Sequence, residues 1–166
     1  MPTNKPISES AAYTKATSLC ARSEQCSFDI MQKLLKWGLD EDKANTLLKR
    51  MIEEQFIDDA RYARAFVNDK SKFQGWGKIK IEFGLRKKHI SSAIISDVIG
   101  NIDNELSEDN LRKILKSKAR SIKETDPYKR KASLFRFAAS RGYEPGMIGR
   151  ILPEITGNCD DSEYEY

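Results

Sequence analysis

The chain has 166 residues, of which 39% are hydrophobic and 33% are charged, and its formal net charge is +4 at pH 7. This length fits one domain or a series of small repeats, and the composition predicts a thin core beneath a large surface. The sequence contains no signal peptide and no apolar run long enough to cross a membrane, so we expect a cytoplasmic protein without a membrane partner.

The expected helices follow from capping signals along the chain. Residues 1–9 are polar, contain two prolines and predict a disordered tail. A first helix is expected at about residues 10–23. Ser27 predicts the cap of a second helix that ends near Gly38, and Asp40 predicts the cap of a third.

The same signals recur further along the chain. An apolar residue stands directly before each of the caps Asp58, Ser91 and Ser107, which predicts the starts of the fourth, sixth and seventh helices. Proline at the first helical position predicts that the eighth and ninth helices start at Pro127 and Pro145. Tyr62 and Phe66 lie one turn apart in the fourth helix, and we expect both to face the core.

These segments form an internal repeat. Gly38, His89 and Gly142 end equivalent apolar segments and are spaced 51 and 53 residues apart. We therefore predict three units of three helices, at residues 10–56, 57–104 and 105–156, with an acidic C-terminal tail at residues 157–166. One unit is too small to bury its apolar face, so neighbouring units must stack.

Residues 78–83 alternate between lysine or glutamate and apolar side chains, which is the local pattern of a strand. No second strand is available to pair with this segment, and the equivalent segments 27–37 and 127–141 look helical. We predict a helix here, with Ile79 and Phe83 on one side and Ile81 and Leu85 on the other.

No catalytic or metal-binding constellation is expected. The three cysteines (Cys20, Cys26 and Cys159) and the single histidine lack the spacing of a zinc site. Asp58 and Asp59 are interpreted as cap and helix-dipole partners rather than a catalytic carboxylate pair. We therefore predict a protein that is not an enzyme and needs no cofactor.

Basic residues gather in the middle of the chain. Residues 70–90 carry seven lysines and arginines against one acid, and residues 112–136 carry ten against two. This distribution indicates a polyanionic or acidic partner, with a solvated helix face as the alternative. Trp76 lies in the glycine-containing turn Gly75–Lys78, either exposed for binding or folded into the core.

The segment Ile57-Asp58-Asp59-Ala60-Arg61-Tyr62-Ala63, followed by Phe66-Val67 and by Gly75-x-Gly77, resembles the RecX family of regulators of the RecA recombinase. Leu35-Lys36-Trp37-Gly38 resembles the turn that recurs at the ends of that family's units. Lysine stands where the family has much of its arginine, and His89 stands where it has glycine.

The resemblance implies an all-α, elongated curved array of three tandem three-helix repeat units. It also implies a monomer that binds the RecA filament on DNA and restrains filament growth, strand exchange and ATPase activity. Direct binding of nucleic acid through the basic surface is the alternative, and weak direct DNA binding could accompany the first function. The predicted partner-binding residues are Lys70, Lys72, Trp76, Lys78, Lys80, Arg86, Lys87, Lys88, Arg112, Lys116 and Arg120.

Overall fold

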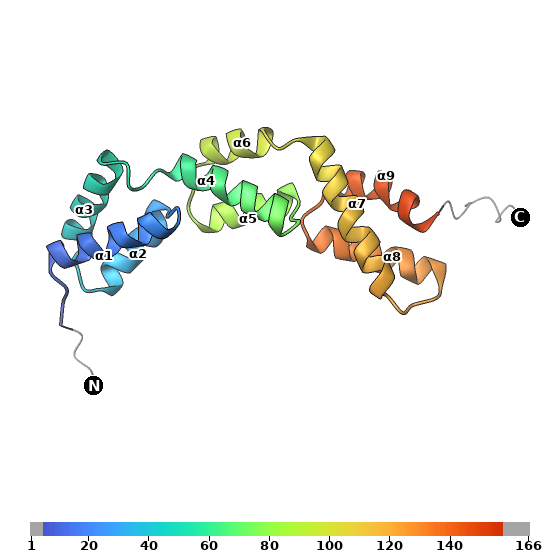
Figure 1. The fold of residues 1–166 in the computed structure, drawn as a ribbon, viewed down its shortest axis with the longest axis horizontal. Helices are drawn as coiled ribbons and strands as arrows, with labels where there is room; N and C mark the ends of the chain where they lie inside the picture. Colours follow the sequence, from blue (N-terminus) through green and yellow to red (C-terminus); the bar gives the residue numbers. More distant parts are fainter. Residues whose placement is uncertain (1–4, 158–166) are drawn as a thin grey trace, which may run out of the picture. The chain divides into compact units, whose positions relative to one another are not determined.

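The computed structural model describes residues 5–157 and is built from helices (Figure 1). Within that range it has nine α-helices, one π-helix and no strand, which confirms the predicted all-α class. The α-helices are α1 Glu9–Arg22, α2 Ser27–Lys36, α3 Glu41–Glu53, α4 Asp59–Asn68, α5 Lys78–Lys87, α6 Ser92–Gly100, α7 Asn104–Ser121, α8 Pro127–Ser140 and α9 Pro145–Thr156. The π-helix η1, Asp69–Phe73, lies between α4 and α5. None of the described helices combines the length and apolar character that a membrane span requires.

Most predicted helix starts are confirmed, and two caps differ. Asp40 and Asp126 cap α3 and α8 through their side chains. The predicted cap Ser107 was wrong: the cap of α7 is Asp103, four residues earlier, whose carboxylate accepts a hydrogen bond from the amide of Glu105 at 2.9 Å. Ser107 is instead a buried residue inside α7.

Residues 78–83 are helical, as predicted, and form the first part of α5. Ile81 and Leu85 are fully buried, whereas Ile79 and Phe83 are 49% and 58% exposed. The strand-like alternation therefore arises from a helix whose apolar residues occupy two different sides.

The described residues form two compact units. The first contains the chain up to Phe66 together with Leu85–Ser96, and the second contains Val67–Gly84 together with residues 97–157. The chain passes from one unit to the other within α4, α5 and α6. The first core includes the fully buried Ile30, Leu34 and Met51, and the second includes Leu111, Leu115, Leu134 and Ile148. The boundaries of the three predicted repeat units stay a prediction.

The two predicted tails extend beyond the described residues. Residues 1–4, and the acidic tail from residue 158 onward with Cys159, lie outside them. The described part of the predicted N-terminal tail is held in place. The Ile7 amide donates to the Trp37 carbonyl at 3.2 Å, and Ser8 caps α1 by accepting from the Ala11 amide at 3.1 Å.

The three repeat anchors adopt the same left-handed conformation. The φ angles are +99° at Gly38, +54° at His89 and +90° at Gly142. The amide after each anchor donates to the carbonyl five residues before it, at 3.2 Å for Leu39, 3.3 Å for Ile90 and 3.3 Å for Tyr143. This is the hydrogen bond of the Schellman motif, which satisfies a carbonyl at the helix end. The sequence repeat therefore marks one turn geometry that occurs three times.

The turn at Gly142 lies against the start of α5. The Gly77 amide donates to the Arg141 carbonyl at 2.7 Å, and the Ile79 amide donates to the Gly142 carbonyl at 3.0 Å. A Cβ added at Gly142 would lie 2.3 Å from the Cβ of Lys80, and a Cβ at Gly77 would lie 2.4 Å from the carbonyl carbon of Gly142. Two glycines are thus required where these backbones meet.

Asp58 and Asp59 have different partners, and both stabilise helix starts. Asp58 caps its own helix by accepting from the Arg61 amide at 3.0 Å. Asp59 reaches the start of α2, where it accepts from the amide of Ser27 at 2.8 Å and from its hydroxyl at 2.6 Å. The predicted cap Ser27 is therefore itself the first residue of α2, and the capping carboxylate comes from a residue 32 positions away.

Arg61 makes further contacts between these elements. Its guanidinium contacts Glu24 at 2.6 Å and donates to the carbonyls of Gln55 and Phe56. The Asp-Asp-x-Arg motif therefore joins the starts of α2 and α4 to the end of α3.

The fourth helix buries a smaller residue than expected. Ala63 is fully buried, whereas Tyr62 and Phe66 are half-buried, with ring centroids 6.0 Å apart. The expectation that both aromatics face the core was therefore only partly right, because Ala63 and not an aromatic residue is the fully buried side chain of α4.

Replacing Asp59 by alanine removes both bonds to Ser27 and leaves the start of α2 without its cap. We expect Asp59→Ala to lower the free energy of unfolding by about 1–3 kcal/mol. Urea denaturation followed by circular dichroism measures this change. Glu53→Ala removes an exposed carboxylate from the end of α3 and should change stability by no more than about 0.5 kcal/mol. Equal stability of the two variants would contradict the bracing role of Asp59.

Replacing Gly142 by alanine places a Cβ against the backbone of Lys80 in a left-handed residue. We expect a loss of about 2–5 kcal/mol from strain and from displacement of α5. Gly149→Ala is the matched control: it lies inside α9 with open space around it and should gain about 0.5–1 kcal/mol from helix propensity. Thermal denaturation of both variants provides the comparison, and similar melting temperatures would show that the joint tolerates a side chain.

Candidate functional site

Trp76 lies between two lysines. The ammonium nitrogen of Lys70 is 4.8 Å from the ring centroid, and that of Lys80 is 4.4 Å away. Both distances suit a cation–π interaction. The indole is half-buried, so neither of the two expected arrangements of Trp76, exposed or inside the core, describes it fully. We call Lys70, Trp76 and Lys80 the tryptophan cluster.

The backbone around this cluster is fixed from several directions. The Trp76 amide donates to the Lys70 carbonyl at 2.9 Å. The Tyr143 hydroxyl donates to the Gly75 carbonyl at 2.9 Å, and the Asn110 side chain donates to the Ser71 carbonyl at 3.0 Å. Lys70 is part of the π-helix η1, a type of helix that often marks functional sites. The two lysines are therefore placed by α7, by the turn at Tyr143 and by the start of α5.

Other predicted residues of this region point outward. Lys72 is exposed, and its neighbour Phe73 is 81% exposed. Lys78 donates to the side-chain oxygen of Asn104 at 2.7 Å. The end of η1 therefore presents a cation and an aromatic ring to solvent, whereas Lys78 at the start of α5 is held by Asn104.

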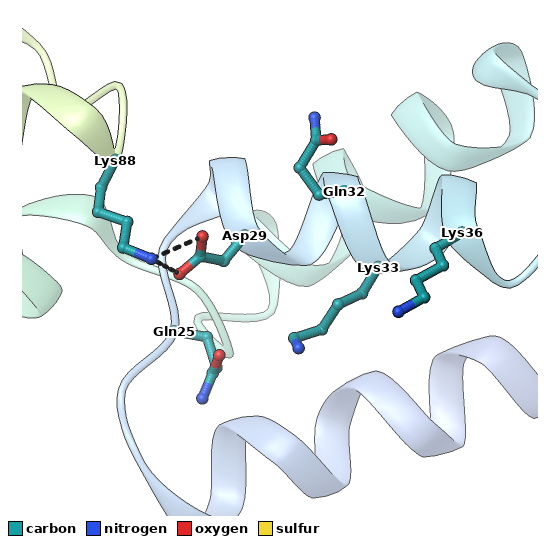
Figure 2. A pocket seen from close by; sticks show the side chains of 6 residues that line it. All are labelled: Gln25, Asp29, Gln32, Lys33, Lys36 and Lys88. Carbon is teal, nitrogen blue, oxygen red and sulfur yellow. Dashed lines mark hydrogen bonds and ion pairs between the residues drawn. The ribbon is translucent and has the colours of Figure 1, made fainter.

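Arg86 and Lys87 lie at the end of α5, and Lys88 follows it directly. Arg86 and Lys87 are exposed. Lys88 contacts both carboxylate oxygens of Asp29, at 3.0 and 3.1 Å (Figure 2). The adjacent His89 stacks on Phe28, with centroids 4.0 Å apart and the rings nearly parallel. His89 adopts a left-handed conformation, and its ring makes a contact that glycine could not make.

The Lys88–Asp29 pair lies beside a cleft of about 360 Å³ on α2 (Figure 2). Lys33 and Lys36, one turn apart on α2, line it together with Gln25 and Gln32. Neither lysine was among the predicted binding residues, although their spacing along a helix is a signal that the sequence contains.

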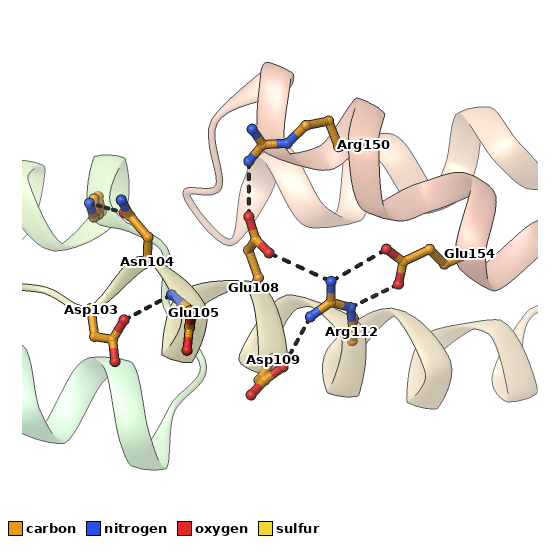
Figure 3. A network of polar contacts seen from close by, with 9 residues as sticks. Asp103, Asn104, Glu105, Glu108, Asp109, Arg112, Arg150 and Glu154 are labelled. Carbon is orange, nitrogen blue, oxygen red and sulfur yellow. Dashed lines mark hydrogen bonds and ion pairs between the residues drawn. The ribbon is translucent and has the colours of Figure 1, made fainter.

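Arg112 differs from the other predicted cations. Its guanidinium contacts Glu154 at 2.8 Å, Asp109 at 3.0 Å and Glu108 at 3.5 Å, and Glu108 also contacts Arg150 (Figure 3). The hydrogen bond to Glu154 raises the pKa of Arg112, and the same bond lowers the pKa of Glu154. Arg112 therefore joins α7 to α9 instead of presenting its charge outward.

Lys116 and Arg120 lie further along α7 and are exposed. Three further cations, Lys113, Lys118 and Arg141, line a separate cleft between α7 and α8 and were not predicted. Lys113 and Lys118 lie on α7 and Arg141 directly follows α8, so their grouping depends on how these two helices pack.

Potential metal ligands do not gather anywhere in residues 5–157: no group of three or more histidine, cysteine or acidic side chains is placed to hold an ion. Burial raises the pKa of the Cys26 thiol to about 11, so this cysteine stays protonated at neutral pH.

Comparison with known proteins links two stretches of the chain, which lie within the second and third predicted units, to one family. The model of the second three-helix domain of RecX matches residues 58–99, and the model of the third matches residues 107–152. Regulatory protein RecX of Clostridium acetobutylicum is 30% identical over 148 residues, covering 87% of this chain and 68% of that protein. Regulatory protein RecX of Clostridium perfringens (strain 13) is 32% identical over 132 residues, and the match spans 78% of this chain but only 61% of that relative's length.

Two solved structures have the same fold. The crystal structure of RecX from Lactobacillus salivarius superposes with a TM-score of 0.78 at 18% identity and covers 89% of this chain and 96% of that one. A second crystal structure, of regulatory protein RecX, gives a TM-score of 0.80 at 21% identity, covering 86% of this chain and 72% of that one. At these identities the likeness establishes the fold.

The hydroxyl of Tyr143 should make the stability of the protein depend on pH in the alkaline range. Burial raises the pKa of Tyr143 from 10.0 to about 12. Between these values the unfolded chain loses this proton and the folded protein keeps it, so the contribution of Tyr143 to stability is full below pH 10 and is lost as the pH rises toward 12. We expect Tyr143→Phe to make this fall shallower, while Tyr62, whose pKa burial also raises to about 12, maintains part of it.

Urea denaturation at pH 8, 10 and 11 measures this effect. At pH 8, Tyr143→Phe should also lose about 1 kcal/mol, because the Gly75 carbonyl loses its donor. Tyr128→Phe is the control, since that side chain is 62% exposed, and it should keep the wild-type pH dependence. If the stability of Tyr143→Phe fell with pH as steeply as that of the wild type, the raised pKa of Tyr143 would be contradicted.

Proposed function

The chain belongs to the RecX family, and on that basis we propose that it is a regulatory protein that binds the RecA filament on DNA. In this proposal it restrains filament growth, strand exchange and ATP hydrolysis, acts as a monomer in the cytoplasm and catalyses no reaction itself. The observation that carries the proposal is the match of both repeat segments, residues 58–99 and 107–152, to three-helix domains of RecX.

The tryptophan cluster supports a binding role. Cations held over an indole lose less conformational freedom on binding than lysines in open solvent, because the ring already restricts them. A filament of protein on DNA offers both carboxylates and phosphates, and complementary charge speeds encounter and aligns the partners. We propose that Lys70, Trp76 and Lys80 form the centre of the contact surface.

We also propose as contact residues the other predicted cations of η1, α5, the residue after α5, and α7, each within its own compact unit. Arg112 is left out, because three carboxylates already surround its guanidinium. Lys88 contributes less than its neighbours, because Asp29 offsets its charge. The proposed contact residues are Lys70, Lys72, Trp76, Lys78, Lys80, Arg86, Lys87, Lys88, Lys116 and Arg120.

Direct nucleic-acid binding is the second candidate, and the basic residues of η1 and α5 favour it. The two functions differ in their dependence on salt and on the recombinase. Binding to phosphates alone weakens steeply between about 50 and 200 mM salt. Retention on RecA filaments but not on bare DNA at about 150 mM salt would support the first function over the second.

The DNA-dependent ATPase of the recombinase from the same organism tests the proposal. We expect increasing amounts of the protein to lower ATP hydrolysis and strand exchange together, because both need an extended filament. Unchanged rates of both reactions at saturating protein would refute the proposed function.

The charge reversal Lys80→Glu with Lys87→Glu tests the surface. These residues lie two helical turns apart on α5, and reversing both should raise the concentration needed for half-inhibition by about tenfold or more, since like charges across an interface cost several kcal/mol. The control Lys49→Glu with Lys131→Glu reverses two exposed charges on α3 and α8 and should inhibit like the wild type. Circular dichroism verifies folding of both variants. Equal inhibition by the two double variants would show that α5 is not part of the contact surface.

A further inference from the structure

A row of ion pairs joins α7 to α9 and reaches the last turn of α9. Glu108 of α7 contacts Arg150 of α9 at 3.0 Å, and one helical turn further Arg112 contacts Glu154 at 2.8 Å (Figure 3). Both pairs join residues that are 42 positions apart, so the two helices run in the same direction here. The row therefore advances along both helices toward the C-terminal end of α9.

Two cations continue this row on α7 after α9 has ended. Lys116 and Arg120 follow Arg112 at steps of four residues, which places them along one side of the helix. Both side chains are exposed, and neither forms an ion pair with another described residue. Because α9 ends at Thr156, it supplies no carboxylate at the next turn. The described chain thus leaves two positive charges where the row stops.

The charge of Lys116 acts on the last turn of α9. The pKa of Glu154 is lowered, mainly by its hydrogen bond to Arg112, and the positive charges of Arg112 and Lys116 lower it further. A carboxylate that follows Glu154 along the chain therefore enters a region of positive potential.

The residues that follow the described chain are acidic. Residues 158–166 lie outside the described residues and contain no lysine or arginine. We call them the acidic segment, and its carboxylates belong to Asp160, Asp161, Glu163 and Glu165. Nine residues of extended chain span about 30 Å. Arg120 lies about 12 Å beyond Arg112 along the axis of α7, so the acids can reach both cations from the end of α9.

The cations on the other side of α7 are less suited to this contact. Lys118 is two residues from Lys116, which turns it to the opposite side of the helix. It lines the cleft between α7 and α8, with its ammonium nitrogen 5.1 Å from the ring centroid of Phe137. The guanidinium carbon of Arg141 lies 5.2 Å from the same centroid. These two cations have an aromatic partner, whereas the row on α7 lacks an acidic one among the described residues.

We propose that the acidic segment folds back onto α7 and pairs with Lys116 and Arg120. Because the segment is joined to the surface that it contacts, weak ion pairs form at a high effective concentration. Exposed ion pairs each contribute little free energy, so the contact opens readily. Both cations belong to the proposed contact residues. On the basis of the proposed function, the segment therefore competes with the anionic partner and weakens inhibition of the recombinase.

The contact is tested first without a recombinase, so that this result does not depend on the proposed function. A water-soluble carbodiimide joins a lysine amine to a carboxylate that touches it, and mass spectrometry of the full chain identifies the joined residues. We expect Lys116 to be joined to the acidic segment about fivefold more often than Lys131, an exposed lysine of α8. The yield at Lys116 should fall as salt rises, because salt screens exposed charges.

Equal yields at Lys116 and Lys131 would overturn the proposal. Crosslinks between two copies of the chain, in place of crosslinks within one, would assign the acidic segment to a second copy and would overturn it too.

The competition is tested with a variant that neutralises the acidic segment. At low salt it should need about three- to fivefold less protein for half-inhibition of the recombinase ATPase, because the two cations are no longer covered. The substitutions are Asp160→Asn, Asp161→Asn, Glu163→Gln and Glu165→Gln. A control variant changes the net charge equally at exposed acids elsewhere and should inhibit like the wild type. Its substitutions are Glu41→Gln, Asp42→Asn, Glu53→Gln and Glu144→Gln.

The same neutralisation is repeated in a chain that carries Lys116→Gln and Arg120→Gln. There it should change the half-inhibitory concentration no further, because the segment has lost its target. An equal gain in both backgrounds would show that net charge alone acts and would overturn the competition. A neutralised variant that inhibits like the wild type would also overturn it. If no variant inhibits at all, the proposed function and the competition both fail, and the crosslinking result still decides whether the contact exists.

Discussion

The close approach of the turn at Gly142 to the start of α5 is the constraint on which the candidate surface depends. The Gly77 amide contacts the Arg141 carbonyl at 2.7 Å, a distance that leaves no room for a Cβ on either glycine. This contact fixes the first turn of α5, and Lys80 lies in that turn. The position of the lysine over Trp76 therefore follows from a contact between two backbones, and side chains can vary around it while the glycines are kept.

The same kind of turn is used at the other two repeat anchors with different partners. At Gly38 the turn is covered by the N-terminal segment, where the Ile7 amide contacts the Trp37 carbonyl, the residue equivalent to Arg141. At His89 a ring stack on Phe28 lies where the third turn has a glycine contact. A left-handed residue other than glycine costs about 1–2 kcal/mol. The stack is a contact that only a side chain can make, so the histidine contributes packing where glycine would contribute conformational freedom.

The basic residues of this chain divide into those that hold the fold together and those that are available to a partner. Arg61 has a short contact to Glu24 between α1 and α2, and Arg112 has one to Glu154 of α9. Arg130 bonds to two backbone carbonyls. Several lysines instead lie on exposed surfaces or over aromatic rings. Arginine suits internal bridging because its planar group donates in several directions at once, whereas lysine is a compact charge on a flexible stem. The lysine-rich character of the central segments therefore agrees with a role in binding.

The sequence by itself determined the helical class, the repeat of one turn at Gly38, His89 and Gly142 and most helix starts, because caps, glycines and apolar spacing act over a few neighbouring residues. It also marked Asp58 and Asp59 as helix-start residues. Only the tertiary structure decided that Asp59 caps a helix 32 residues away, that Arg112 is enclosed by carboxylates, and that Lys118 and Arg141 meet at one ring. Each of these depends on which helices lie side by side, and helical periodicity specifies the face of a helix but not its neighbour.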